Sequence, residues 1–327
     1  LQQPLSVPEL TEPLPVETLG RFLQSPVAAF FNQRLQIRFS GVEVSDTDNE
    51  NFQLDGLNHW RLESELIQQV VTKAIDEIEF LEKTSACLEV MAARGDLGMG
   101  ITERQLRRDL QARLPDIFRR YQEQTALWPQ RVIDPHPFSY RYDSKHGPIL
   151  LEGALDRLRQ NAEGRWCRLV VASSKLLEGS GRNAQVRYHK LLTDWVLHLV
   201  AQAEGYDLLT TVIAKEEGKI IQLPPLPAEQ AVEKLNCLLA AWQEGMTRPL
   251  PVEAETAYAW LGGLYKTKGG GDEEALAQAE ARYTVMLARD PGYLNGAWPD
   301  FDGLMASGEF GDWVRRLYED VRQLSQG

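Results

Sequence analysis

The middle of this chain contains strand-like segments, and helical patterns lie on both sides of it. The segments are residues 136–142, 148–158 and 166–172, and then, after a helical pattern over 185–203, a hairpin pattern over 208–213 and 219–223. The first alternates and is aromatic, and the others are short apolar runs that turn residues separate, which is typical of strands. The order of elements predicts an α/β (α+β) fold in which many helices flank a small mixed sheet.

Helical periodicity dominates the flanking parts. Apolar residues recur at helical spacing over 60–94, which predicts one long helix that Gly95 ends. Thr102 begins a Thr-x-x-Gln capping box, and the helix after it is expected to pause at Pro115. Residues 228–244 form another amphipathic pattern, whereas the acidic segment 40–55 is expected to be a loop.

Composition shifts divide the chain into four parts. We expect an extended, proline-rich lead-in over 1–16, a mainly helical part over 17–130, the sheet core over 131–227 and a helical extension over 228–327 that packs on the core. The extension is rich in aromatic residues, and such apolar mass is not expected to stay in water. A length of 327 residues agrees with about two domains.

Charge and cysteine content narrow the class of protein. The net charge is −12, which argues against a freestanding nucleic-acid binder but leaves room for a local basic face. Three scattered cysteines favour a reducing compartment, and no apolar run approaches the roughly 20 residues of a membrane span. Because the chain begins with Leu1 and a proline-rich stretch, we expect a piece of a longer cytoplasmic protein that does not enter membranes.

The centre carries the clearest chemical pattern. Asp156 ends one strand candidate, and the apolar strand that ends at Val171 follows a turn. An acid at the end of each of two adjacent strands makes a site for Mg²⁺. A lysine two residues past the second acid would lie on the same strand face and stabilise a charged transition state. Here Ala172 stands at the position of the second acid and Ser174 at that of the lysine.

This arrangement resembles the restriction-endonuclease-like nuclease family, also written PD-(D/E)xK. It more closely resembles the nuclease domains of bacterial helicase–nuclease subunits, with Gly-x-x-Asp-Arg on one strand and Asp-Tyr-Lys on the next. Gly153, Asp156 and Arg157 match the first motif, and Gln185 with Tyr188 or His189 loosely matches a later one. The second motif is absent, because Lys175 falls one residue late and would point to the opposite face. We therefore predict no catalytic residue, no metal and no cofactor, with Asp156, Ala172 and Ser174 as degenerate positions.

Several further stretches resemble one family, the gamma subunits of exodeoxyribonuclease V, the RecC subunits of RecBCD complexes. They are 19–26 with 30–31, 54–57, 153–158, 249–252 with 256–261, and 299–302 with 307–310. The resemblance implies a nuclease-like domain without activity in a helicase–nuclease that acts in DNA double-strand break repair and recombination. It also implies the beta and alpha subunits and DNA as partners, with a role in scaffolding those subunits and guiding DNA strands.

Residues 156–190 carry a net charge of +5, from eight basic and three acidic residues. The candidates for contact with the DNA backbone are Arg157, Arg159, Lys175, Arg182, Arg187 and Lys190. A solvated or salt-bridged face is the alternative interpretation. By contrast, residues 228–327 carry a net charge of −7, so we assign them to partner contact or scaffold.

Two other functions stay open. The first is an active Mg²⁺-dependent nuclease whose ligands come from elsewhere, such as Glu152 or Glu178. The second is a pure protein-interaction module without DNA contact. Tyr140, Tyr142 and Trp166 could stack on exposed bases, although core packing is the favoured interpretation.

Overall fold

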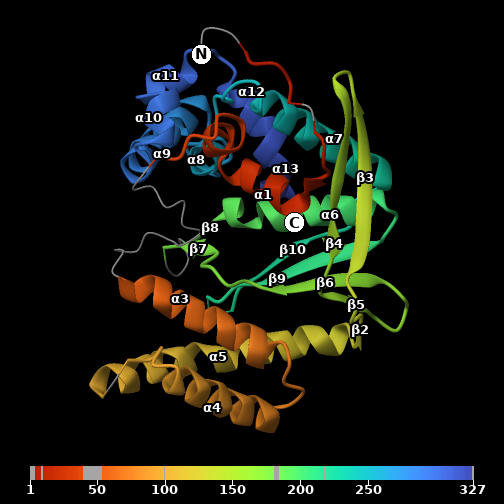
Figure 1. Cartoon of the computed structure of the whole chain (residues 1–327), viewed down its shortest axis with the longest axis vertical. Helices are drawn as coiled ribbons and strands as arrows, with labels where there is room; N and C mark the ends of the chain where they lie inside the picture. Colours follow the sequence, from red (N-terminus) through yellow and green to blue (C-terminus); the bar gives the residue numbers. More distant parts are fainter. Residues whose placement is uncertain are drawn as a thin grey trace.

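The computed structural model describes residues 4–8, 10–39, 54–98, 100–179, 184–216 and 218–325. A five-stranded sheet lies between two helical layers of unequal size (Figure 1). Its strands, in spatial order, are β10 (Ile220–Leu223), β9 (Leu208–Ile213), β6 (Trp166–Val171), β5 (Leu158–Gln160) and β2 (Gln130–Arg131). β6 and β9 are parallel and are connected through helix α6 (Leu192–Ala203), whereas the other pairs are antiparallel. The mixed α/β class predicted from the sequence is confirmed.

Strand β6 is buried on both faces. Cys167, Leu169 and Val171 belong to the apolar cluster of the smaller helical layer, whereas Val170 and Ala172 belong to the larger cluster on the other face. Burial on both faces explains why this strand is apolar apart from Arg168 and does not alternate.

The smaller layer contains α3 (Leu54–Leu66) with a π-helical turn (Ile67–Val71), α4 (Glu77–Ala93) and α5 (Ile101–Leu127). The single helix predicted over 60–94 is therefore wrong. The chain breaks before Asp76, whose carboxylate caps α4 by accepting a hydrogen bond from the Glu79 amide at 2.8 Å. Ile75 and Ile78, counted in the apolar pattern, are 79% and 71% exposed. Most of the loop predicted over 40–55 lies outside the described residues.

Helix α5 continues through Pro115, so the predicted pause is also wrong. Its buried Arg120 donates hydrogen bonds to the carbonyl oxygens of Ala214 and Lys219, both at 2.8 Å. These bonds attach α5 to the chain between β9 and β10. This arginine therefore serves the fold.

The larger layer covers the opposite face of the sheet (Figure 1). Its helices besides α6 are α1 (Val16–Gln24), α2 (Pro26–Ala29) with a π-helical turn (Phe30–Arg34), α7 (Ala228–Gly245), α8 (Ala254–Leu264), α9 (Asp272–Arg289), α10 (Tyr293–Ala297), α11 (Phe301–Met305), α12 (Phe310–Val314) with a π-helical turn (Arg315–Glu319), and α13 (Asp320–Leu324). The aromatic tail is part of the main core, because Phe310, Val314 and Tyr318 are fully buried. No helix among the described residues is long and apolar enough to cross a membrane.

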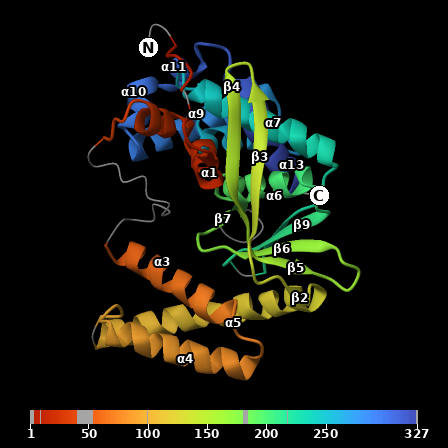
Figure 2. The same ribbon diagram turned by 45° about the vertical axis from the view of Figure 1, so that its right-hand side comes forward.

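A long hairpin of β3 (His136–Ser144) and β4 (Gly147–Leu155) stands beside α7 (Figures 1 and 2). The Tyr140 hydroxyl donates to Asn236 of α7 at 2.8 Å, which supports core packing for this tyrosine. Strand β1 (Leu14–Pro15) pairs in parallel with β4. The strand predicted over 148–158 ends at Leu155, because Arg157 adopts a left-handed turn conformation with φ of +57°.

A two-stranded ribbon of β7 (Leu177–Glu178) and β8 (Gln185–Val186) precedes α6. A 3₁₀ turn, Tyr188–Leu191, then leads into the helix. The helix predicted over 185–203 therefore begins only at Leu192. This ribbon and turn form one wall of a cavity described below.

Candidate functional site

Asp156 lies in the turn between β4 and β5, next to the end of β6. The Leu169 amide donates to the Arg157 carbonyl oxygen at 3.0 Å, which extends the pairing of β5 with β6 toward the turn. The turn that holds Asp156 therefore lies beside β6, although β4 and β6 belong to different sheets and are not the adjacent strands that the sequence pattern assumed. Ala172 follows β6 directly and still donates its amide to Ile213 of β9 at 2.9 Å.

The carboxylate of Asp156 is held by an internal cation. Arg168 on β6 contacts the Asp156 Oδ1 atom at 3.1 Å and the Asp194 Oδ1 atom, on α6, at 2.6 Å. The Arg168 side chain is only 3% exposed, against 18% for Asp194 and 40% for Asp156. Burial lowers the pKa of Arg168, but Asp194 and then Asp156 raise it, and the net result is a pKa above the ordinary value. A protonated guanidinium therefore bridges the two carboxylates.

The other two degenerate positions lie where the strand ends. Ala172 is buried in the main core, and Ser174 is half-buried in a bend. Because β6 ends at Val171, strand alternation does not extend to Ser174 or Lys175, so the argument that placed Lys175 on the opposite face does not apply. Among the described residues, no group of three or more His, Cys, Asp or Glu side chains could hold a metal ion.

The candidates for DNA contact have different environments. Arg157 is ion-paired with Asp156 at 3.3 Å, and Arg159 donates to the carbonyl oxygens of Trp128 and Pro129. Lys175 and Lys190 are half-buried. Arg182 lies outside the described residues. Arg187 is also half-buried, and it lines the cavity described below.

The buried histidine of α6 and the two acids proposed as alternative ligands make other contacts. His198 is buried between Thr210 at 3.0 Å and the Pro224 carbonyl oxygen at 3.1 Å, and burial lowers its pKa to about 4. Glu178 pairs with Arg282 at 2.9 Å, and Ser139 donates to Glu152 at 3.3 Å. Neither acid has a recorded contact with Asp156.

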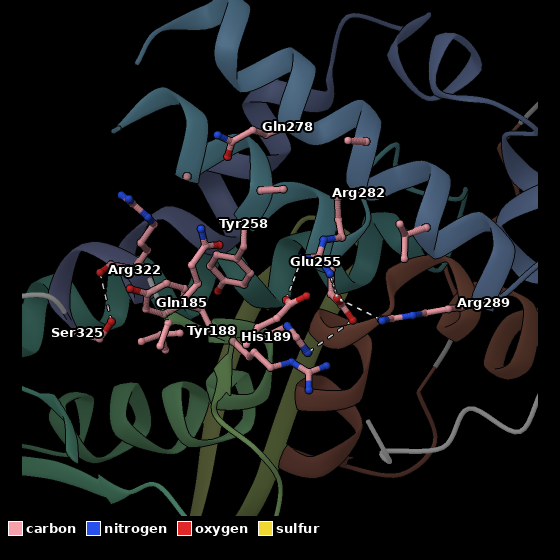
Figure 3. Close-up of a pocket in the computed structure, with 18 of the residues that line it drawn as sticks. Gln185, Tyr188, His189, Glu255, Tyr258, Gln278, Arg282, Arg289, Arg322 and Ser325 are labelled. Atoms are coloured by element: carbon pink, nitrogen blue, oxygen red, sulfur yellow. Dashed lines mark hydrogen bonds and ion pairs between the residues drawn. The ribbon is translucent and has the colours of Figure 1, made fainter. Parts of the chain in front are cut away.

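A second feature, which the sequence reasoning missed, is a cavity of about 820 Å³ between the β8 segment and the C-terminal helices (Figure 3). We call it the arginine cavity. The charged residues that line it are Arg187, Lys219, Arg282, Arg289 and Arg322, together with Glu178 and Glu255. Figure 3 shows Glu255 between Arg282 and Arg289, with contacts of 3.2 and 3.6 Å.

The sheet and the helical layers define a mixed α/β protein in which a buried arginine neutralises the acid at the end of a strand. The chain belongs to the RecC C-terminal domain family, which matches residues 11–265. It is 28% identical over 321 residues to the RecBCD enzyme subunit RecC of Escherichia coli strain K12. That alignment covers 95% of this chain but 24% of the relative, so the chain spans about a quarter of the relative's length. The predicted family is confirmed.

Proposed function

We propose that this chain is a non-catalytic, nuclease-like part of a RecBCD-type complex, where it handles DNA and scaffolds the beta and alpha subunits. The restriction-endonuclease-like core is part of this proposal. One observation carries the loss of catalysis: the Arg168 guanidinium neutralises the acid that would bind Mg²⁺ in an active relative. The positions for the second acid and the lysine hold a buried methyl group and a hydroxyl.

Chemistry supports the same conclusion. A divalent cation needs several hard oxygen ligands, and Ala172 and Ser174 supply no carboxylate. Asp156 would have to leave a charge-assisted pair with Arg168, which would leave a positive charge beside the incoming ion. Asp156 is therefore present at the strand end, but its pair with Arg168 serves stability.

The test is a digestion assay on single- and double-stranded DNA with Mg²⁺ or Mn²⁺, with thermal unfolding measured in the same buffers. We expect no degradation and no rise in melting temperature on metal addition. Degradation that Asp156→Asn abolishes, or a metal-induced stabilisation that the same substitution removes, would refute the proposal and favour the active nuclease. Asp143→Asn, which changes an exposed acid of the β3–β4 hairpin, is the matched control.

Partner binding is the second candidate function, and an exposed apolar group at α4 favours it. Ile75, Ile78 and Leu81 are 79%, 71% and 59% exposed. Isolated apolar residues are ordinary on surfaces, but three within seven residues are typical of a contact surface. Co-purification with the beta and alpha subunits tests this function. We expect Ile78→Asp with Leu81→Asp to weaken recovery, and unchanged recovery would exclude this surface.

A further inference from the structure

The arginine cavity is a local positive site on an acidic protein. Five cationic side chains and two carboxylates line it, which gives a net charge of +3 in a chain of −12. His189 does not add to this charge, because burial, and then the nearby cations, hold its pKa well below the ordinary value. The cavity therefore attracts anions although the surrounding C-terminal block is acidic.

The internal carboxylates do not neutralise all of these cations. Glu255 contacts Arg282 at 3.2 Å and Arg289 at 3.6 Å, and Glu178 contacts Arg282 at 2.9 Å, so two carboxylates face these two guanidinium groups. Arg322 lies over the ring of Tyr265 at 5.2 Å and has no carboxylate within ion-pair distance among the described residues. Its guanidinium N–H groups remain for an anion that enters the cavity.

A buried hydroxyl in the same wall also lacks a partner. The Tyr258 oxygen is inaccessible to solvent and makes no hydrogen bond with any described residue. Burial, followed by Tyr318 and Tyr188, raises its pKa well above the ordinary value, so it remains an O–H donor. Such an orphaned group costs about 1–3 kcal/mol. A turn of the Tyr258 side chain, which lines the cavity, would let the hydroxyl meet a ligand oxygen and remove that cost.

We propose that the arginine cavity binds the phosphate group of a nucleotide, with Arg322 and the Tyr258 hydroxyl as donors. A tetrahedral phosphate accepts hydrogen bonds from several directions and suits donors that come from different helices. The volume of about 820 Å³ lies within the roughly 300–1,000 Å³ of ligand sites, so it admits a whole nucleotide. Gln185 and Gln278 also line the cavity and offer amide groups to a base.

The phosphate can belong to a DNA strand or to a free nucleotide. The first source deepens the proposed function and rests on it, whereas the second does not. A cavity that takes one nucleotide favours a single strand over an intact duplex, because single-strand grooves combine cations with tyrosine side chains. Tyr188 and Tyr258 both line this cavity.

The experiment measures binding by the full chain at low salt, with a fluorescent single-stranded oligonucleotide, dAMP and inorganic phosphate in separate titrations. Arg322→Gln and Tyr258→Phe should each weaken binding about tenfold, the value of one charge-assisted contact. Arg316→Gln is the matched control, because Arg316 also lies over an aromatic ring, that of Trp313, but does not line the cavity. It should change the affinity less than about twofold.

The outcomes separate the sources and the two proposals. Oligonucleotide binding that the cavity variants weaken supports the site on a DNA strand, whereas dAMP binding alone with the same variant response assigns it to a free nucleotide. Oligonucleotide binding that neither variant alters overturns the cavity but leaves the DNA-handling function standing. No binding of any probe, or variant-sensitive binding of a polyglutamate peptide alone, overturns the phosphate proposal. Thermal unfolding of Tyr258→Phe guards against misfolding, because loss of an orphaned hydroxyl should not lower the melting temperature.

Discussion

Replacing Arg168 with methionine should destabilise the protein strongly. The Arg168 side chain is 3% exposed and bridges two carboxylates, of which Asp194 is 18% exposed. Removing one partner of a buried ion pair costs about 3–5 kcal/mol, because the remaining charge has neither water nor a counter-ion. We assign most of this cost to Asp194, since Asp156 is 40% exposed and water screens it.

Urea unfolding of a graded set of variants measures these contributions. Asp156→Asn should cost less than about 1 kcal/mol, because the pair is partly exposed and Arg168 keeps Asp194. Arg168→Lys keeps the charge but cannot form the same fork of hydrogen bonds, so its loss should lie between those of Asp156→Asn and Arg168→Met. The triple variant Arg168→Met, Asp156→Asn, Asp194→Asn carries no charge and should recover most of the stability lost by Arg168→Met alone.

Two results would refute this reasoning. A loss below about 1 kcal/mol for Arg168→Met would show that the guanidinium is not needed to neutralise Asp194. A triple variant as unstable as Arg168→Met would show that packing of the arginine side chain, and not its charge, stabilises the site.

Other substitutions test the buried titratable groups and the helix packing. Because the pKa of His198 falls to about 4, the unfolded chain binds its proton more tightly, so this histidine should make stability rise with pH from about 4 to 6.5 by roughly 3 kcal/mol. Burial, and then Glu255, raise the pKa of Glu253 to about 7, so this acid should make stability fall as pH rises from 4.5 to 7. Because His189 also has a lowered pKa and still contributes a rise, urea unfolding across this range should show a smaller rise with pH for His198→Gln than for the wild type and a larger one for Glu253→Gln. Profiles parallel to that of the wild type would contradict both assignments. Gly263→Ala should cost about 1–3 kcal/mol, because its new Cβ would lie 2.6 Å from the Ala275 Cα atom, whereas Gly262→Ala meets only the end of Gln278 and should be tolerated. Equal melting temperatures for the two glycine variants would contradict the close approach of α8 and α9.

The longer strands were predictable because their signal is local, whereas the two-residue strands β1, β2, β7 and β8 were missed. Each of these longer strands needs only a short alternating or apolar run. The six residues of β6, for example, are mostly apolar and mostly buried. The helix predicted over 60–94 failed because periodicity does not reveal a cap. Asp76 caps the start of α4 by accepting one hydrogen bond, so a new helix begins there. Ile75 and Ile78, which the periodicity placed on the buried face, are exposed.

The two sites differ in how much of each could be predicted from the sequence. Asp156, Ala172 and Ser174 could be found because a known spacing connects them, whereas the contact of Arg168 with Asp194 joins residues 26 positions apart. The arginine cavity was not predicted, because the net charge of residues 228–327 is −7 and gives no sign of a local basic cluster. Three of its arginines come from that acidic block and meet Arg187 only in the folded chain.

A single substitution would not restore catalysis at the strand end that holds Asp156. Ala172 lies with Val170 in the main core, so the carboxylate of Ala172→Asp would be buried among apolar side chains, and Arg168 would still hold Asp156. An unpaired buried carboxylate is costly, so this substitution would destabilise the core before it could supply a metal ligand. An active site would therefore need the removal of Arg168 together with a new acid and a new lysine. Arg168 therefore stabilises this site and also occupies the acid that catalysis would need. The Arg168→Met measurement tests the first of these roles.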